Sequence, residues 1–318
     1  MALTAKQAVL VTLALEMYDT TARFSDKIAA VFPLTDIDTA KLGWLNRLPG
    51  FRTWVDERMV SGISDKEYLV KAAKYEETIG IKSEDWRWGR LYNAEALMRT
   101  IGADAAKFPD DLLIDVVNNG ESLKTYDDKA LFSATHPSGA GANNSNIITG
   151  TGVTIDKLGD DWDTACTRMQ GFIVGATGNT DTRKLDVKPN AVLCPPGLER
   201  KFKTLFSAEQ IDTSTNVYKG EIPLENIFAS SKLSDANDWF AIYIGNPGVK
   251  PFAMVTVDST DSGEPGSRVI ASKGGFSISY LGPESEHTFW TDDVIIGAKL
   301  FVKLAPFAWF YICKIKNA

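Results

Sequence analysis

Metal or acid–base chemistry needs histidines, cysteines or paired carboxylates at suitable spacing, and this chain holds only two histidines. His136 lies in a stretch rich in glycine and asparagine. His287 stands beside Glu284 and Glu286 in a turn that also contains glycine and proline. A single histidine between acids in such a turn is more often solvated than bound to a metal. The histidines therefore predict no metal site.

The three cysteines are far apart in the sequence and share no metal-ligand spacing. Cys166, Cys194 and Cys313 each stand among apolar residues of an expected helix or strand. Cysteine in such a setting behaves as a small hydrophobic side chain. We predict three buried free thiols.

Signatures of hydrolases, dinucleotide-binding proteins, P-loop proteins and zinc peptidases are all absent from the sequence. The acidic pairs Asp160–Asp161 and Asp292–Asp293 fall at expected edges of helices or strands, where caps and solvated turns account for them. A glycosidase pair of carboxylates is the alternative that sequence alone leaves open. We expect no catalytic residue, no cofactor and no enzyme activity.

Trp86 and Trp88 stand near Arg87 and Arg90, a combination that can stack on the bases of a single strand. The net charge is −7, from 41 acidic and 34 basic residues, and no run of five Lys or Arg occurs. Tight independent binding to nucleic acid is therefore not expected. A container for nucleic acid is compatible with this charge, and packing of the tryptophans within a helix is the favoured interpretation.

The composition is that of a globular protein, with 44% hydrophobic and 24% charged residues. Its 318 residues exceed the usual single domain of about 100–150, so one extended or two compact units are expected. No apolar run of about 18 residues occurs, and the first residues lack the basic segment and cleavage site of a signal peptide. We expect a soluble, unsecreted protein without a membrane partner.

The first element is predicted to be a helix over Ala5–Tyr18, with Thr4 as N-cap and Gln7 completing a capping box. Residues 24–42 show no sustained period and are interpreted as an extended arm. Residues 52–60 and 67–81 flank the turn-forming residues 61–65 and predict a long hairpin. A two-stranded ribbon is marginally stable alone, so it must rest on another surface.

The clearest helix is expected over Ser83–Asn118, with Ser83 as N-cap and acids in the first turn. Such a helix would be about 50 Å long. A kink or break is predicted just before Pro109, because proline lacks an N–H and clashes with the preceding turn.

Residues 133–152 are rich in turn-forming types and predict a surface loop, with a domain boundary near Gly150. The elements expected beyond it are a helix over 155–172, a buried strand over 191–194, a helix over 196–205, a central strand over 239–244 and an aromatic strand over 307–312. Helices and strands mix without a regular repeat, so the predicted class is α+β.

Five stretches in collinear order resemble the major head proteins of phage Mu and its prophage relatives. They are LGWLNRLPGFRTWVDER at 42–58, YEETIGIKSED at 75–85, YDDKALFSATHP at 126–137 with Ser145–Asn146, VLCPPGLE at 192–199 and DWFA at 238–241. Asp128 stands where the family usually has glycine, and the strand after residue 307 does not align with the family. This resemblance assigns His136 a structural role.

The resemblance implies the Hong Kong 97 type of capsid fold. We expect an N-terminal arm over 1–45, an E-loop hairpin over 46–82, a peripheral domain with a long spine helix over 83–150 and 273–318, and an axial domain over 151–272. The E-loop would lie on a neighbouring subunit. The expected inter-subunit contact residues are Trp54, Arg58, Lys66, Glu67, Lys71 and Lys74.

The implied function is that of a major capsid protein, which self-assembles into hexamers and pentamers of an icosahedral head around the double-stranded DNA of a tailed phage. The implied partners are other copies of the chain, DNA contacted without sequence specificity, a separate scaffolding protein, a portal and decoration proteins. The expected location is the virion, assembled in the host bacterial cytoplasm. The alternative is the shell of an encapsulin-like compartment.

Overall fold

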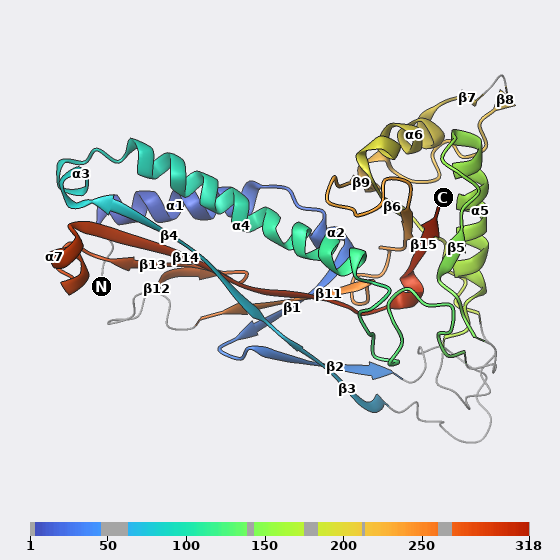
Figure 1. Ribbon diagram of the computed structural model, residues 1–318, viewed down its shortest axis with the longest axis horizontal. Coiled ribbons are helices and arrows are strands. Elements are labelled where there is room, and N and C mark those ends of the chain that lie inside the picture. Colours follow the sequence, from blue (N-terminus) through green and yellow to red (C-terminus); the bar gives the residue numbers. More distant parts are fainter. Residues whose placement is uncertain are drawn as a thin grey trace.

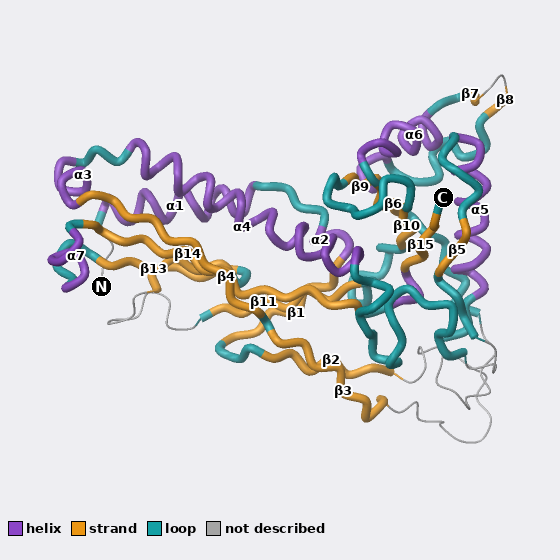
Figure 2. Tube along the Cα trace, viewed as in Figure 1, coloured by secondary structure: helices purple, strands orange, loops and turns teal. Residues whose placement is uncertain are grey.

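The chain forms two units, each built on its own sheet (Figure 1). The computed structural model describes residues 4–45, 63–138, 143–174, 184–211, 214–259 and 269–317. The first unit is long and flat, and the second stands at one end of it (Figure 2). Both units combine helices with a sheet, which confirms the predicted α+β class.

The first unit contains a six-stranded sheet in the order β1-β11-β14-β13-β12, with β4 paired to the other side of β14. β1 and β11 are parallel, and the other pairs are antiparallel. The strands are β1 (Ala29–Thr35), β4 (Ala73–Lys82), β11 (Phe252–Asp258), β12 (Val269–Lys273), β13 (Phe276–Leu281) and β14 (Asp293–Pro306). β14 is the central strand of this sheet, because it pairs directly with β4, β11 and β13.

Two helices that run in the same direction, α1 (Ala5–Thr20) and α4 (Tyr92–Asn118), lie together on one face of this sheet (Figure 1). Along β14, residues from Val294 to Val302 alternate between buried and half-buried, as expected when only one face is fully covered. Thr4 and Gln7 form the predicted capping box of α1. The first predicted helix is confirmed, with two more residues at its end.

The expected single helix from Ser83 is divided into α3 (Ser83–Trp88) and α4. The break falls at Gly89, whose φ of 72° only glycine adopts at little cost. No break occurs at Pro109, which lies buried inside α4. Lys82, not Ser83, is at the N-cap position of α3, and no side chain caps it. The positions of the break and of the cap were therefore predicted wrongly.

The residues expected to form an extended arm are built into the first unit. α2 (Ser25–Ile28) is followed by β1, which pairs with β11 along its whole length. The carboxylate of Asp110 in α4 accepts hydrogen bonds from the backbone N–H of Ser25 at 2.8 Å and of Phe24 at 3.3 Å. The sequence prediction missed this strand because Pro33 and several Thr-Asp pairs obscure its alternation.

A two-stranded ribbon, β2 (Thr39–Leu45) with β3 (Ile63–Lys71), extends from the first unit (Figure 1). The partner of β3 is therefore 39–45, a segment that had been assigned to the arm. Residues 63–65 lie in β3 and not in the predicted turn. Residues 52–60, the expected first half of the hairpin, lie outside the described residues.

The second unit contains a five-stranded sheet in the order β5-β15-β10-β6-β9. Its strands are β5 (Ile147–Thr149), β6 (Ala191–Cys194), β9 (Ile227–Ala229), β10 (Trp239–Ile242) and β15 (Ile312–Lys316). The helices α5 (Ile155–Gly171) and α6 (Pro196–Ser207) pack with it, and a small pair, β7 (Gln210–Ile211) with β8 (Ser214–Thr215), lies at its far end (Figure 1). All four residues of β10 are buried, as predicted for a central strand.

The sheets divide the chain differently from the expected boundaries. β11 and β12 lie in the first sheet, although they fall within the expected axial segment 151–272. β15 lies in the second sheet, although it falls within the expected peripheral segment 273–318. The aromatic run expected as a strand forms a buried turn, η2 (Trp309–Tyr311), between β14 and β15. The continuous segment from β14 through η2 to β15 therefore belongs to both sheets.

Two short elements complete the described structure: η1 (Leu224–Asn226), before β9, and α7 (Glu286–Thr291), between β13 and β14. Within the described ranges, no helix combines the length and the apolar character needed to cross a membrane.

Candidate functional site

The surface ribbon β2–β3 is the first candidate for contact with other molecules. Ala40, Leu42 and Val70 are buried, whereas Leu69 is 58% exposed. The Tyr68 hydroxyl donates a hydrogen bond to the carbonyl of Lys124 at 3.4 Å, and burial raises the pKa of Tyr68 to about 12. One face of the ribbon thus rests on its own chain, and the face that bears Leu69 is left open.

The six expected contact residues are only partly described. Trp54 and Arg58 lie outside the described residues. Lys66 and Glu67 lie in β3, where Glu67 is opposite Gly43 of β2.

Lys71 ends β3, and its ammonium group is 3.1 Å from the Asp38 carboxylate. Hydrogen bonds from Thr39 and then from Lys71 lower the pKa of Asp38. Lys74 is exposed in β4, opposite Phe301 of β14. Contact of these residues with another subunit stays a prediction.

The motif around His136 forms a buried cluster and not the surface loop that was expected. His136 is fully buried, and its Nδ1 lies 2.7 Å from the Asp127 carboxylate. Its Nε2 lies 3.3 Å from the carbonyl of Leu131, and its ring stacks on Trp309 with centroids 4.0 Å apart. The Trp309 Nε1 donates a hydrogen bond to the Tyr126 hydroxyl at 3.1 Å. This confirms a structural role for His136 and joins the loop to η2.

Asp128 adopts the left-handed conformation, with a φ of 64°. Its backbone N–H donates a hydrogen bond to the carbonyl of Thr125 at 3.1 Å, closing a turn. Aspartate tolerates this conformation better than most residues, although glycine adopts it more readily. Asp128 therefore fits the conformation that this turn requires.

Asn146, in the Ser-Asn pair of the same motif, connects three segments. Its Nδ2 lies within hydrogen-bonding distance of the carbonyls of Leu131 at 2.7 Å, Trp309 at 3.3 Å and Ile312 at 3.3 Å. Its Oδ1 accepts from the backbone N–H of Ser133 at 2.9 Å. This side chain fixes the loop to the start of β15.

Charged side chains tie β15 to Glu121, which follows α4, and to Asp238, which precedes β10. The Lys314 ammonium lies 2.9 Å from the Glu121 carboxylate and 3.2 Å from that of Asp238. Lys316 also contacts Glu121, at 2.8 Å, and the two lysines lower the pKa of Glu121. The Asp238 carboxylate accepts the backbone N–H of Asn317 at 3.0 Å. β15 and Asn317 are thus fixed to these neighbouring segments.

The three cysteines are buried and free, as predicted. Burial raises the pKa of each thiol, Cys166, Cys194 and Cys313, to about 12. A thiol that stays protonated is a poor nucleophile and a poor metal ligand. The cysteines thus fill space in the core.

The remaining chemical candidates have structural surroundings. Asp161 is buried inside α5, where its two oxygens accept the backbone N–H of Thr151 at 3.0 Å. Asp292 is the C-cap of α7, and Asp293 pairs with Lys82 at 2.9 Å. No group of three metal-binding side chains occurs among the described residues.

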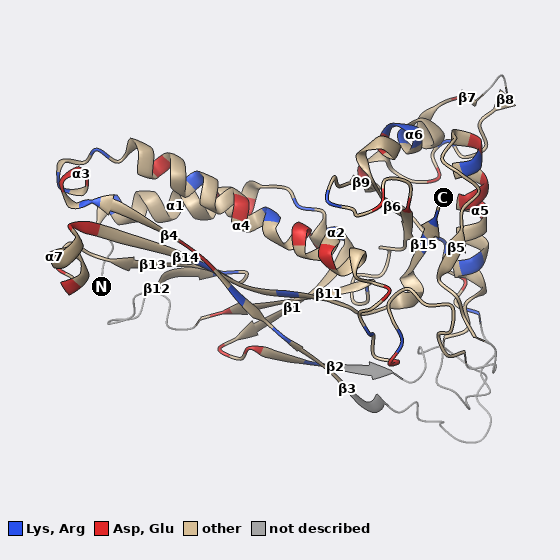
Figure 3. Cartoon of the chain, viewed as in Figure 1, with Lys and Arg blue, Asp and Glu red and all other residues tan. Residues whose placement is uncertain are grey.

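Trp86 is buried against Tyr280, with ring centroids 5.5 Å apart, as expected for helix packing. Trp88 is exposed, and the Arg90 guanidinium lies 4.3 Å from the centroid of its ring. The two tryptophans therefore do not form a common stacking platform. Along α4 and α5, acidic and basic positions are interspersed and do not gather into one basic patch (Figure 3).

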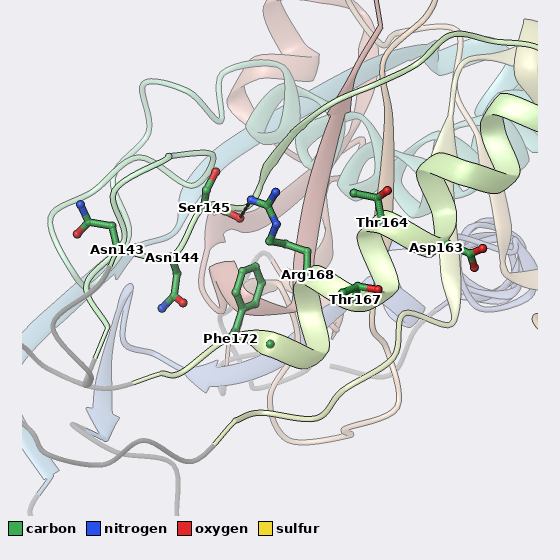
Figure 4. Close-up of a pocket in the computed structure, with 9 residues that line it drawn as sticks. Asn143, Asn144, Ser145, Asp163, Thr164, Thr167, Arg168 and Phe172 are labelled. Atoms are coloured by element: carbon green, nitrogen blue, oxygen red, sulfur yellow. Dashed lines mark hydrogen bonds between the residues drawn. The ribbon is translucent and has the colours of Figure 1, made fainter.

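A hollow of about 540 Å³ lies between α5 and the loop at 143–145. Arg168 reaches across it and donates a hydrogen bond to the carbonyl of Ser145 at 3.2 Å (Figure 4). Asn144 uses its Nδ2 to contact the carbonyl of Ile173 at 3.0 Å. These polar groups hold the loop to the helix, and we assign the hollow no ligand.

Residues 15–158 match the family described as Mu-like prophage major head subunit gpT. This part of the chain is therefore similar to Mu-like major head subunits. The major capsid protein of Escherichia phage Mu is 27% identical over 113 residues, which are 33% of this chain and 37% of that protein. The match therefore spans little more than a third of this relative's length.

Two solved structures share the fold across nearly the whole chain. The procapsid of bacteriophage JBD30 matches with a TM-score of 0.55 at 15% identity, covering 100% of this chain and 77% of that chain. A virus-like particle from Pyrococcus furiosus matches with a TM-score of 0.56 at 12% identity, covering 98% of this chain and 100% of that chain. The chain has the Hong Kong 97 type of capsid fold, as expected.

Sequence reasoning missed two features that bear on contacts. The aromatic pair Phe289–Trp290 on α7 is highly exposed, and its signal was two adjacent aromatic residues in a short segment with acids on both sides. The second is the pairing of 39–45 with β3, which a clearer alternation of apolar residues would have revealed.

Proposed function

We propose that the chain is a major capsid protein, which assembles as hexamers and pentamers into an icosahedral head around the double-stranded DNA of a tailed phage. The observation that carries this proposal is the match of residues 15–158 to a family of head subunits. The fold supports it but is shared with a virus-like particle, so the fold alone does not distinguish phage heads from related shells.

The parts of the molecule fit this role. The first unit would be the peripheral domain, with α4 as its spine, and the second unit would be the axial domain. The E-loop would comprise the ribbon β2–β3 and the residues between its strands. Its open face, marked by Leu69, would lie on the next subunit, together with Trp54, Arg58, Lys66, Glu67, Lys71 and Lys74.

The proposed role is mechanical and involves no catalysis. A net charge of −7 gives the wall no strong attraction for DNA, which suits a container filled by an external motor. The further proposed partners are a separate scaffolding protein, a portal and decoration proteins, with assembly in the host bacterial cytoplasm and a final place in the virion.

The test is the size of the particles formed by the purified full-length chain. Electron microscopy and sedimentation are expected to show rings of subunits or closed shells, far larger than the 34.8 kDa single chain. A species that stays monomeric over a wide range of concentration would overturn the proposal. Shells that enclose a specific protein and exclude DNA, when isolated from their natural host, would favour the encapsulin-like alternative.

A further inference from the structure

The buried histidine of the motif at 126–146 has an acceptor opposite each of its two ring nitrogens. The Nδ1 atom of His136 lies 2.7 Å from the Asp127 carboxylate, and its Nε2 atom lies 3.3 Å from the carbonyl oxygen of Leu131. A neutral imidazole has a proton on only one nitrogen, and the other nitrogen is then itself an acceptor. If His136 were neutral, one of the two contacts would therefore set two acceptors against each other.

The burial of this cluster makes such a mismatch costly. The His136 side chain is fully buried, and the Asp127 side chain is 5% exposed. The Leu131 carbonyl also accepts a hydrogen bond from the Asn146 Nδ2 at 2.7 Å, which leaves it one lone pair for His136. A buried polar atom without a partner of the opposite kind loses its hydration and gains nothing in return. Both ring nitrogens of His136 therefore require a proton.

The surroundings of the ring balance the charge that the second proton brings. The Oδ1 atom of Asp127 accepts hydrogen bonds from the Thr125 hydroxyl and from the Lys129 backbone N–H, as suits an ionised carboxylate, which has only acceptor atoms. The ring of His136 also stacks on Trp309, with centroids 4.0 Å apart and planes 5° apart. The face of an indole attracts a cation, so the carboxylate and the tryptophan both stabilise an imidazolium.

The charge of His136 depends mainly on this one carboxylate. Among the described residues, Asp127 is the only charged side chain that hydrogen-bonds to the ring. The other titratable group of the cluster is the Tyr126 hydroxyl, which accepts a hydrogen bond from the Trp309 Nε1 at 3.1 Å. Burial raises the pKa of Tyr126 well above its ordinary value, so this hydroxyl stays neutral.

We propose that His136 carries both ring protons at neutral pH, and that the second proton closes a clamp between the motif and Trp309 in η2. When this proton leaves for the solvent at higher pH, the remaining N–H stays on Nδ1, opposite the carboxylate. The Nε2 lone pair then faces the Leu131 carbonyl, and the attraction of a cation for the indole is lost. The hold of the motif on η2, the link between the two sheets, therefore weakens as the pH rises.

The charge is measured by nitrogen NMR of the full-length chain labelled with ¹⁵N-histidine, because protonated and unprotonated ring nitrogens resonate far apart. Magic-angle spinning makes the measurement possible on sedimented particles as well as on single chains. The chain has only two histidines, so the exposed His287 supplies the reference for a ring in water, and His287→Gln assigns the signals. At about pH 7 both nitrogens of His136 should be protonated, although an exposed histidine is mostly neutral there. An unprotonated nitrogen at His136 would overturn the proposal.

Asp127→Asn tests the cause of the charge, because the amide has the same shape as the carboxylate. Its Oδ1 can keep the hydrogen bonds from Thr125 and Lys129, and its Nδ2 can donate to the Nδ1 of His136. The ring should then be neutral, with its proton on Nε2, so that only the Nδ1 signal moves to the unprotonated position. Asp104→Asn, at an exposed carboxylate of α4, is the control and should leave both signals of His136 unchanged. A doubly protonated ring in folded Asp127→Asn would contradict the assignment.

Hydrogen exchange read by mass spectrometry tests the clamp. As the pH rises and His136 loses its second proton, exchange of the backbone amides at 309–314 should quicken by about tenfold or more, after correction for intrinsic rates. The same amides in Asp127→Asn, and those of α6 in the wild type, should show no such step.

The absence of the step in the wild type, or a second proton that stays until the chain unfolds, would overturn the clamp. These measurements do not require shells. A chain that never assembles would overturn the proposed function and leave the signals of His136 to decide this inference.

Discussion

The buried Asn146 side chain shows how single residues of the motif act. It meets four backbone groups from the loop at 131–133, from η2 and from the start of β15. Unpaired backbone groups in the interior are costly, so one amide here stabilises three segments at once. The motif at 126–146 therefore serves to lock the loop and not to bind a ligand.

Replacement of Asn146 by alanine should lower the free energy of unfolding by about 2–4 kcal/mol, because buried donors and acceptors lose their partners. Asn143→Ala is the control, since Asn143 is an exposed residue of the same loop and should change stability by less than about 0.5 kcal/mol. Urea unfolding followed by tryptophan fluorescence measures both. Equal stability of Asn146→Ala and the wild type would show that the four contacts are replaceable.

At the residue scale, the sequence predicted correctly those features that depend only on residues nearby in the chain. The capping box of Thr4 and Gln7 and the buried thiols follow from neighbours in the sequence, and they are confirmed. The burial of His136 could not be predicted in the same way, because its partner Trp309 is 173 residues further along the chain, as the difference in numbering shows. The glycines and asparagines around His136 correctly predicted turns, but they could not indicate that Trp309 would bury this histidine.

At the scale of elements, the contact between α1 and α4 depends on one residue without a side chain. A Cβ added at Gly102 of α4 would lie 2.1 Å from the carbonyl oxygen of Ala14 in α1. The two helices can approach this closely only because Gly102 leaves the space empty. Within a helix, alanine is more favourable than glycine by about 1 kcal/mol. Helix propensity therefore favours alanine at position 102, whereas packing against α1 favours glycine.

Gly102→Ala should therefore destabilise the protein by about 1–3 kcal/mol, since the clash forces the helices apart and outweighs the better propensity. Gly197→Ala in α6 is the matched control, because a Cβ there meets nothing within 4 Å. That variant should be as stable as the wild type or gain up to about 1 kcal/mol. Thermal unfolding of both proteins decides, and a Gly102→Ala protein that melts higher than the wild type would contradict the packing argument.

Prediction of elements succeeded where the apolar pattern was strong. The strand at 191–194 and the helix over 155–171 agree with their expected positions within a residue or two. It failed where the pairing partner is distant or a conformation is unusual, as for β1 with β11 and for the break at Gly89. The helix continues through Pro109 because Met98, Ile101 and Leu113 are buried along the same helix on both sides of the proline.

At the scale of the whole molecule, the three buried thiols make the stability of the fold fall with rising pH in the alkaline range. Each thiol has a pKa of about 12 in the folded chain, against about 8.5 when unfolded. Between these values the unfolded chain releases protons that the folded chain keeps. Since the folded state then binds more protons, its stability is complete below about pH 8.5 and falls as the pH rises.

Raising the pH from about 8 to about 10.5 should lower the free energy of unfolding by about 2–3 kcal/mol for each buried thiol, as the unfolded thiols ionise. Cys194→Ala should be less stable than the wild type near neutral pH but should lose less on this rise. Urea unfolding at both pH values gives the comparison. Identical losses for the two proteins would show that Cys194 does not contribute.

The passage from β14 through η2 to β15 has a consequence for the shape changes open to the subunit. Phe307 in this passage contacts Phe32 of β1, and Trp309 packs against His136 and against Phe172 at the end of α5, so turning one unit against the other would have to break one set of these contacts. The subunit should therefore behave as one rigid body, in which the two units move together. Differences in curvature around a closed shell would then have to be accommodated by the ribbon β2–β3 and by the contacts between subunits.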